Sequence, residues 1–223
     1  FGLGGLGDIG CHTLDIPMYA MQLGYPERVS MADDMDFAQE MGAKKPKDEA
    51  ATYLYEFPAA GNRPPVKVYW YEGGRLPKFP EEMNDPQTGK PKFEGAGGCI
   101  MIGDKNTLYS PSMRPTSPSL VKNWQELRRN LPEKTIPRAI GGPVREVIGA
   151  IRGEIEKPGS NFDYAVPLTE VVILGTIANR SQKGVGIQRQ GNELQGSFLE
   201  RIHQGAGPPG LGVRRGSDLI RAA

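Results

Sequence analysis

The stretch ATYLYEFPAAGNRPPVKVYWYEGG, residues 51–74, decides the fold that the sequence predicts. Aromatic residues stand at every second position near the end of 51–57, and apolar and polar side chains alternate over 66–71. Side chains of a strand point in turn to its two faces, so this period of two predicts two strands. The intervening residues 59–65 contain the glycine, asparagine and prolines of a turn. We therefore expect an antiparallel hairpin.

Shorter strands are expected on either side of this hairpin, at 29–32, 99–102 and 107–109, separated by proline-bearing loops. Apolar periodicity predicts helices at 7–23, 142–152 and 168–180, with a weaker helical tendency at 36–41. The helix at 168–180 is apolar around most of its circumference and should be deeply buried. Helices at both ends of a strand-rich middle predict an α+β fold, a mostly antiparallel open sheet with helices on one face.

Composition excludes several partners. The 27 basic and 26 acidic residues leave a net charge of +1, which gives no field to attract nucleic acid or an anionic membrane. No apolar run approaches the ~20 residues of a membrane span. The two cysteines have no CxxC spacing, so no metal site is predicted. The chain begins at Phe1 inside a glycine-rich run, so we expect preceding residues in the parent protein, and the compartment stays unassigned.

The glycine run at the start matches a nucleotide-binding pattern only in its letters. Gly2, Gly4 and Gly7 satisfy G-x-G-x-x-G. That pattern cradles a pyrophosphate when a strand precedes it and parallel strands follow, whereas this chain continues into antiparallel hairpins. We interpret the run as a tight approach into a helix.

The residues that follow the glycines carry ionisable groups at helical spacing. Asp8 and His12 are four residues apart and therefore share a helix face, and Asp15 lies three residues beyond His12. An imidazole beside a carboxylate can accept a proton from a hydroxyl at neutral pH. An ordinary histidine near a helix start fits the same spacing, so spacing alone leaves both interpretations open.

Four stretches, in this order, resemble one family of enzymes: GLGGLGDIGCHTLDIPMYAMQLG (2–24), VKVYWYEGG (66–74), SNFDYAVPLTE (160–170) and ILGTIANR (173–180). They are similar to the C-terminal, substrate-side domain of the Gfo/Idh/MocA oxidoreductases, which include glucose-fructose oxidoreductase and inositol dehydrogenase. The bacterial branch with a W-Y-[DE]-G-G turn is the most similar. The resemblance covers about Gly4 to about Lys183.

The resemblance implies a reaction and a cofactor. His12 would act as general base on the hydroxyl of a sugar, glycoside or cyclitol while a nicotinamide takes the hydride, and Asp8 would orient the pair. NAD or NADP would be held mainly by an N-terminal Rossmann domain outside these residues, so this chain alone is expected to be inactive. That domain also supplies the lysine of a Glu-Lys-Pro motif. The same three residues at 156–158 lie before the 160–170 match, where the family does not place them.

Other candidates for substrate contacts are weaker. Trp70 and Tyr71 are candidates for stacking on a sugar, although aromatic residues on a strand also serve packing or a subunit interface. Asn161 and Asp163 are candidates for a substrate hydroxyl or for capping the following helix. Asp15 is a further candidate for a substrate contact. The family's sheet commonly forms oligomer contacts, so the resemblance implies a homo-oligomer.

Two other functions remain open. One is a glycosidase of the same family, which oxidises its substrate transiently and recycles the nicotinamide in place. The other is a non-catalytic assembly module that has no nucleotide domain.

The tail departs from the resemblance. From 184 to 223 the chain is rich in glycine, arginine and glutamine without periodicity, and the family's expected ending is absent. Shifting the reading frame by one base allows Val185 onward to be read as LEFNAKEMNFKEASWNAYIKEPVRQGWE, which resembles that ending. We therefore predict a frameshifted, non-native and disordered tail over 184–223, after a domain spanning 1–183.

Overall fold

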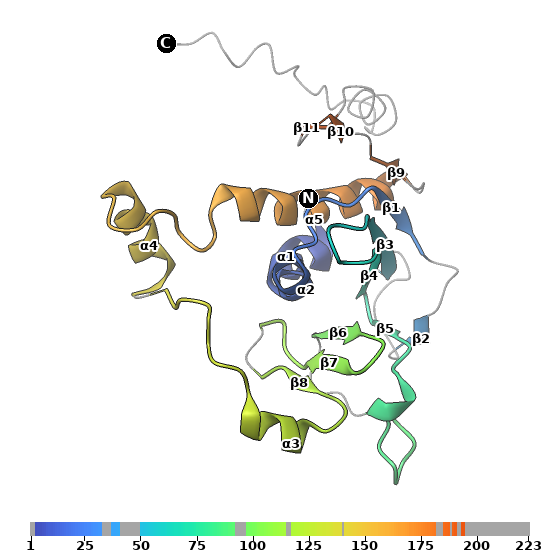
Figure 1. Ribbon diagram of the computed structural model, residues 1–223. Coiled ribbons are helices and arrows are strands. Elements are labelled where there is room, and N and C mark those ends of the chain that lie inside the picture. Colours follow the sequence, from blue (N-terminus) through green and yellow to red (C-terminus); the bar gives the residue numbers. More distant parts are fainter. Residues whose placement is uncertain are drawn as a thin grey trace.

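The computed structural model describes residues 3–32, 37–40, 50–91, 97–114, 117–139, 141–181, 185–187, 189–190 and 193–194. The described helices are α1 Gly4–Thr13, α2 Asp15–Met21, α3 Trp124–Leu127, α4 Gly142–Ile151 and α5 Phe162–Ser181, with 3-10 helices at Glu81–Met83 and Arg128–Asn130. The described strands are β1 Arg28–Met31, β2 Phe37–Glu40, β3 Ala51–Phe57, β4 Val66–Glu72, β5 Arg75–Pro77, β6 Cys99–Ile102, β7 Thr107–Ser110, β8 Ser119–Leu120, β9 Val185–Gly186, β10 Arg189–Gln190 and β11 Glu193–Leu194 (Figure 1).

The central sheet has the strand order β4-β3-β1-β9, and the strands pair antiparallel. Tyr53 of β3 lies opposite Trp70 of β4, so the predicted hairpin is confirmed in position and direction. The later strands do not join this sheet: β6, β7 and β8 form a second one, while β2-β5 and β10-β11 are two-stranded. The α+β class and the open antiparallel sheet are confirmed.

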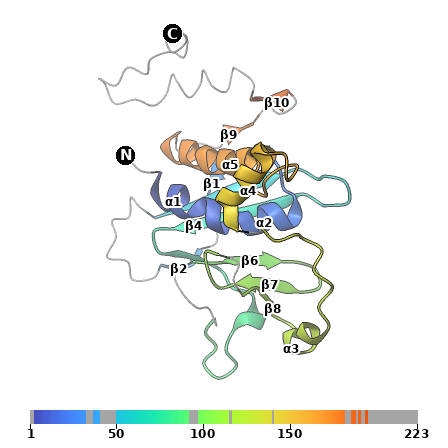
Figure 2. The same ribbon diagram turned by 90° about the vertical axis from the view of Figure 1, so that its left-hand side faces the viewer.

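Helices α1 and α5 pack on one face of the central sheet. The pair α1 and α2 lies between α5 and the second sheet (Figures 1 and 2). Alternate side chains of β3 point into this core, where Tyr53, Tyr55 and Phe57 are buried. The core side chains from α5 are Leu168, Val171, Val172, Leu174 and Ala178.

Three predicted helices differ from the structure. The helix expected at 7–23 is two helices, because Pro17 has no N–H and its ring conflicts with the carbonyl of Thr13, where α1 ends. The segment expected as helical at 36–41 is instead strand β2, which pairs with β5. Helix α5 begins at Phe162 rather than at 168, and Pro167 lies inside it.

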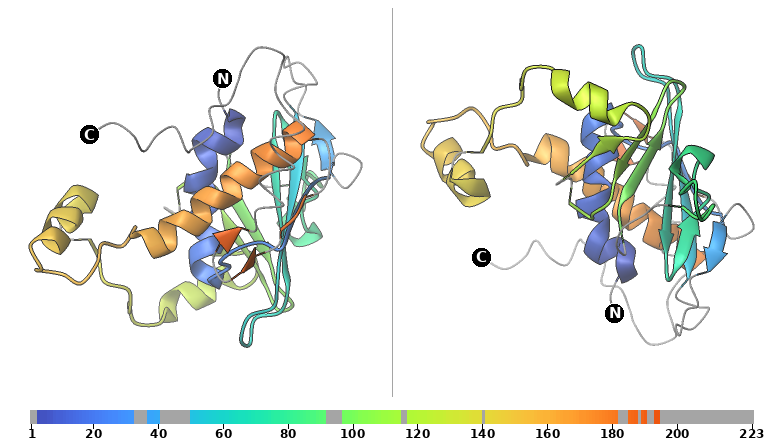
Figure 3. Two further views of the ribbon diagram at one scale, coloured as in Figure 1. Left: turned by 90° about the horizontal axis from the view of Figure 1, so that it is seen from above. Right: turned by 90° about the horizontal axis from the view of Figure 1, so that it is seen from below.

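Helix α5 crosses its neighbours at very short range, seen from above in Figure 3. A Cβ atom at Gly175 would lie 2.1 Å from Tyr55 Oη and 2.6 Å from Leu6 Cδ2. A Cβ atom at Gly10 would lie 3.0 Å from Val172 Cγ2. Glycine at 175 therefore lets α1, α5 and β3 meet at one point.

Part of the predicted tail is described. Val185 pairs with Val29 of β1, and Ile187 donates its N–H to Glu27 O at 2.8 Å and packs against the core. Residues from 195 onward lie outside the described residues, so the frameshift stays a prediction. Among the described residues, no helix has the length and apolar character needed to cross a membrane.

Candidate functional site

Helix α1 presents the predicted acid/base pair to solvent. Leu6 and Gly10 form its buried face, against α5. Asp8 and His12 each follow one of these residues by two positions, which turns them about 200° around the helix axis from the buried face. Both are exposed and lie one helical turn apart. The packing of α1 thus leaves both groups accessible to a molecule that approaches from outside this chain.

The second carboxylate, Asp15, is bound to α5. Tyr164 donates its hydroxyl to Asp15 Oδ1, and its ring meets that of Tyr19 edge to face with centroids 5.6 Å apart. This hydrogen bond joins the start of α2 to the first turns of α5. The helical spacing of Asp8, His12 and Asp15 did not point to Tyr164. The only sequence signal for Tyr164 was its place in the stretch 160–170.

The pairing of Tyr164 predicts alkaline sensitivity. Burial, and then the hydrogen bond to Asp15 and its charge, raise the pKa of Tyr164 above its usual value. Burial likewise raises the pKa of Tyr55, with the nearby Tyr53 and Glu72 adding to the effect. A tyrosine whose pKa is higher in the folded than in the unfolded chain contributes its full stability while the pH is below the unfolded pKa of about 10. This stability is lost as the pH rises from there through the folded pKa.

We therefore expect the free energy of unfolding, measured with urea, to fall as the pH rises above about 10. The Tyr55→Phe/Tyr164→Phe double variant should show a clearly shallower fall than the unmodified chain. Equal slopes for the two proteins would contradict the assignment.

The aromatic residues of β4 point to opposite faces of the sheet. Trp70 packs against the core and donates its indole Nε1–H to Glu72 Oε2 at 3.0 Å. Tyr71 lies on the outer face, stacked on Tyr69 with ring centroids 6.3 Å apart. Because the two predicted sugar contacts are on different faces, Trp70 and Tyr71 cannot line the same site.

The residues before and within the first turn of α5 have mainly local partners. Asn161 donates its side-chain amide to Pro158 O at 3.1 Å, and its backbone carbonyl accepts the N–H of Tyr164 and Ala165. Asp163 is exposed and 3.9 Å from Lys157 Nζ, a separation at which a surface ion pair contributes little. Asn161 thus stands at the entry of the helix, but its side-chain Oδ1, the atom that would cap the helix, is buried without a hydrogen-bond partner among the described residues.

The glycine run does not fit a dinucleotide. A bound pyrophosphate takes the N–H groups of a helix N-terminus. At α1 that place is held by the carboxylate of Glu72, whose Oε2 accepts Leu6 N–H at 2.7 Å. Gly4 and Gly5 lie against this carboxylate. A carboxylate of the chain itself therefore occupies the N-terminus of α1, where a phosphate would bind. This agrees with the interpretation that these glycines only lead into a helix.

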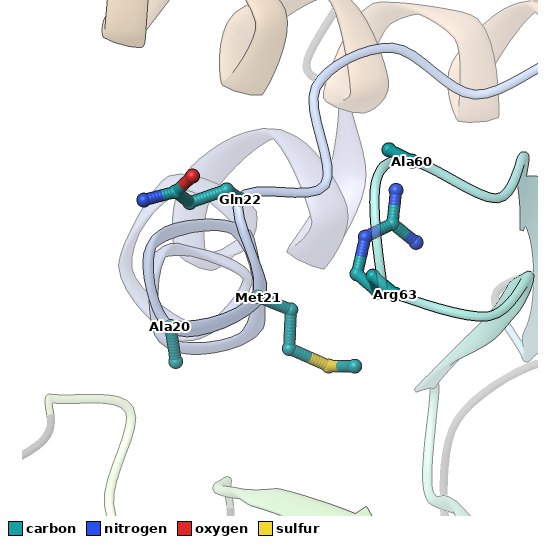
Figure 4. Close-up of a pocket in the computed structure, with 5 residues that line it drawn as sticks. All are labelled: Ala20, Met21, Gln22, Ala60 and Arg63. Carbon is teal, nitrogen blue, oxygen red and sulfur yellow. The ribbon is translucent and has the colours of Figure 1, made fainter.

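A cavity of about 450 Å³ lies at the far end of α2. It is lined by Ala20, Met21, Gln22, Ala60 and Arg63 (Figure 4). The guanidinium of Arg63 donates to the carbonyls of Pro58 and Pro64. None of the predicted site residues lines this cavity, so we assign it no role in the acid/base chemistry.

The cysteines are free thiols. Burial, and then the charge of Asp15, raise the pKa of the exposed Cys11, and burial raises the pKa of Cys99 to about 11. Both thiols therefore stay protonated and weakly nucleophilic at neutral pH. In the described part of the chain, no cluster of three or more His, Cys, Asp and Glu side chains is arranged to hold a metal ion.

No protein-family model matches the chain, and no curated protein matches it.

Proposed function

We propose that this chain is the substrate-side part of a nicotinamide-dependent oxidoreductase that acts on a hydroxyl carbon of a sugar, glycoside or cyclitol. The observation that carries the proposal is the exposure of Asp8 and His12, one turn apart on a helix that is buried on its other side. In the family that the sequence resembles, a D-x-x-x-H pair of this kind carries the chemistry, which supports the proposal.

His12 has the chemistry that the reaction requires. Its imidazole, when neutral, accepts the hydroxyl proton as the carbon–hydrogen bond breaks. Asp8, one turn away, interacts favourably with the imidazolium that forms, which makes the proton transfer easier. NAD or NADP, when bound, accepts the hydride from the same carbon.

The nucleotide is held by a second domain in this proposal. The start of α1 is occupied by Glu72, so the glycine run does not serve as the phosphate site. A domain that covers the exposed side of α1 would bring the nicotinamide to the hydroxyl that His12 contacts, and would exclude water from the reacting atoms. The outer face of the central sheet, which carries Tyr69 and Tyr71, is then the proposed subunit contact.

The test is an assay of the complete gene product. It is incubated with NAD or with NADP and a panel of sugars, glycosides and cyclitols, and reduced nicotinamide is followed by its near-ultraviolet absorbance. We expect substrate-dependent reduction of one of the two nucleotides. Release of free sugar from a glycoside without net reduction would favour the glycosidase. A gene product that binds neither nucleotide would contradict both enzymes and favour an assembly module.

A further inference from the structure

Helix α1 begins without a cap of its own. The preceding residue, Leu3, makes no side-chain hydrogen bond to the helix, and the first turn contains no acidic residue. The N–H groups of a first turn have no partner within the helix. Gly4 and Gly5, which open α1, are also poor helix formers. The first turn of α1 therefore depends on an acceptor from elsewhere in the fold.

Glu72, the last residue of β4, supplies that acceptor. Its Oε2 atom accepts Leu6 N–H at 2.7 Å, a length typical of a hydrogen bond to a charged group. Glycine at position 5 leaves room for this carboxylate, since a Cβ atom there would lie only 3.2 Å from Oε2.

The carboxylate of Glu72 is held in turn by the sheet and by α5. Trp70 Nε1 donates to Oε2 at 3.0 Å, and the Tyr53 hydroxyl donates to Oε1 at 2.9 Å. The Tyr53 oxygen then accepts a hydrogen bond from Asn179 Nδ2 of α5 at 3.0 Å. The first turn of α1 is thus connected by hydrogen bonds to β3, β4 and α5.

We infer that Glu72 is a positioning residue, which fixes α1 on the sheet and so sets where Asp8 and His12 meet the substrate. The inference rests on the proposed function for its catalytic part. Asp8 and His12 lie about 3 and 9 Å along the helix axis from Leu6. A change in the tilt or fraying of the first turn is therefore passed on to both groups.

Glu72→Gln in the 223-residue chain tests the positioning directly. The substitution keeps the size of the side chain, removes the charge and turns one acceptor into a donor. We expect the Leu6 amide to exchange with deuterium about 10-fold faster. Residual dipolar couplings, which report the orientation of each N–H bond, should change in α1 and stay constant in α5. Unchanged exchange and couplings would overturn the inference.

Glu56→Gln is the matched control. Glu56 lies on the outer face of the same sheet, where it pairs with Arg28 and Lys67, away from α1. The same chemical change there should leave the Leu6 amide and the couplings of α1 as they were. An equal response to both substitutions would show a general loosening of the sheet and would count against the specific role of Glu72.

Kinetics of the complete gene product test the catalytic part. In Glu72→Gln, kcat should fall about 10-fold because a small misplacement of the base is costly, while KM changes by less than about a factor of two. The shape of the pH–rate profile should stay the same, since Glu72 itself exchanges no proton with substrate. A purely structural role would lower Tm and leave kcat unchanged below the melting range. If the unmodified gene product has no turnover, the proposed function fails, and the exchange and coupling data still decide whether Glu72 positions α1.

Discussion

Replacing His12 by asparagine in the complete gene product should lower kcat by about 100-fold or more. Asparagine can still donate a hydrogen bond to the substrate but cannot take up the hydroxyl proton, so the loss reports proton transfer. KM should change much less, because the exposed imidazole contributes mainly at the transition state. Initial rates of nicotinamide reduction at saturating substrate are the measurement.

The other histidine of the chain provides the control. His203→Asn makes the same chemical change in the tail, outside the described residues, and should leave kcat unchanged. Asp8→Asn should lower kcat by a smaller factor than His12→Asn, since Asp8 interacts with the imidazole rather than with the substrate proton. Full turnover by His12→Asn would remove His12 from the mechanism.

Gly175→Ala should destabilise the fold by about 1–3 kcal/mol, the usual cost of overpacking a core. In an open helix the same change would stabilise by about 1 kcal/mol, so the sign of the effect is diagnostic. The new methyl group would meet Tyr55 Oη at 2.1 Å and Leu6 Cδ2 at 2.6 Å. Urea denaturation of the chain measures the difference.

A double-mutant cycle identifies the clash. Tyr55→Phe removes a buried hydroxyl that has no hydrogen-bond partner among the described residues, so alone it should be neutral or stabilising. When Gly175→Ala is made in the Tyr55→Phe variant, it should lower the free energy of unfolding clearly less than in the unmodified chain. Gly149→Ala in helix α4, where a Cβ atom would meet nothing closer than 3.6 Å, is the control for the substitution itself. Equal costs of Gly175→Ala with and without the Tyr55 hydroxyl would contradict this packing.

The sequence predicted the hairpin of β3 and β4 well, because the period-two pattern of Tyr53, Tyr55 and Phe57 is local and one face is buried. The shared helix face of Asp8 and His12 also followed from local spacing, although α1 begins at Gly4 and not at residue 7 as predicted. Two local signals were misjudged. Pro17 marked the break between α1 and α2, and strand alternation already placed Trp70 and Tyr71 on different faces.

The remaining features depend on contacts between distant parts of the chain. Strand β2 forms through pairing with β5, although its own residues show no strand alternation. The hydrogen bonds between Leu6 and Glu72 and between Tyr164 and Asp15 join segments far apart in the sequence, and local spacing cannot predict such pairs. A carboxylate at the end of a strand and a tyrosine in a helix are too common to indicate such partners.

The packing of α1 against α5 determines when the core can form during synthesis of the chain. Helix α1 packs against α5, so this core joins two segments that lie far apart in the sequence, and α1 is made before α5. Until α5 leaves the ribosome, the apolar faces of α1 and of β3 have no helix to cover them. Between the synthesis of β3 and that of α5 the nascent chain therefore exposes a strand-rich apolar surface, a state in which slow, non-local folding favours aggregation and calls for chaperones.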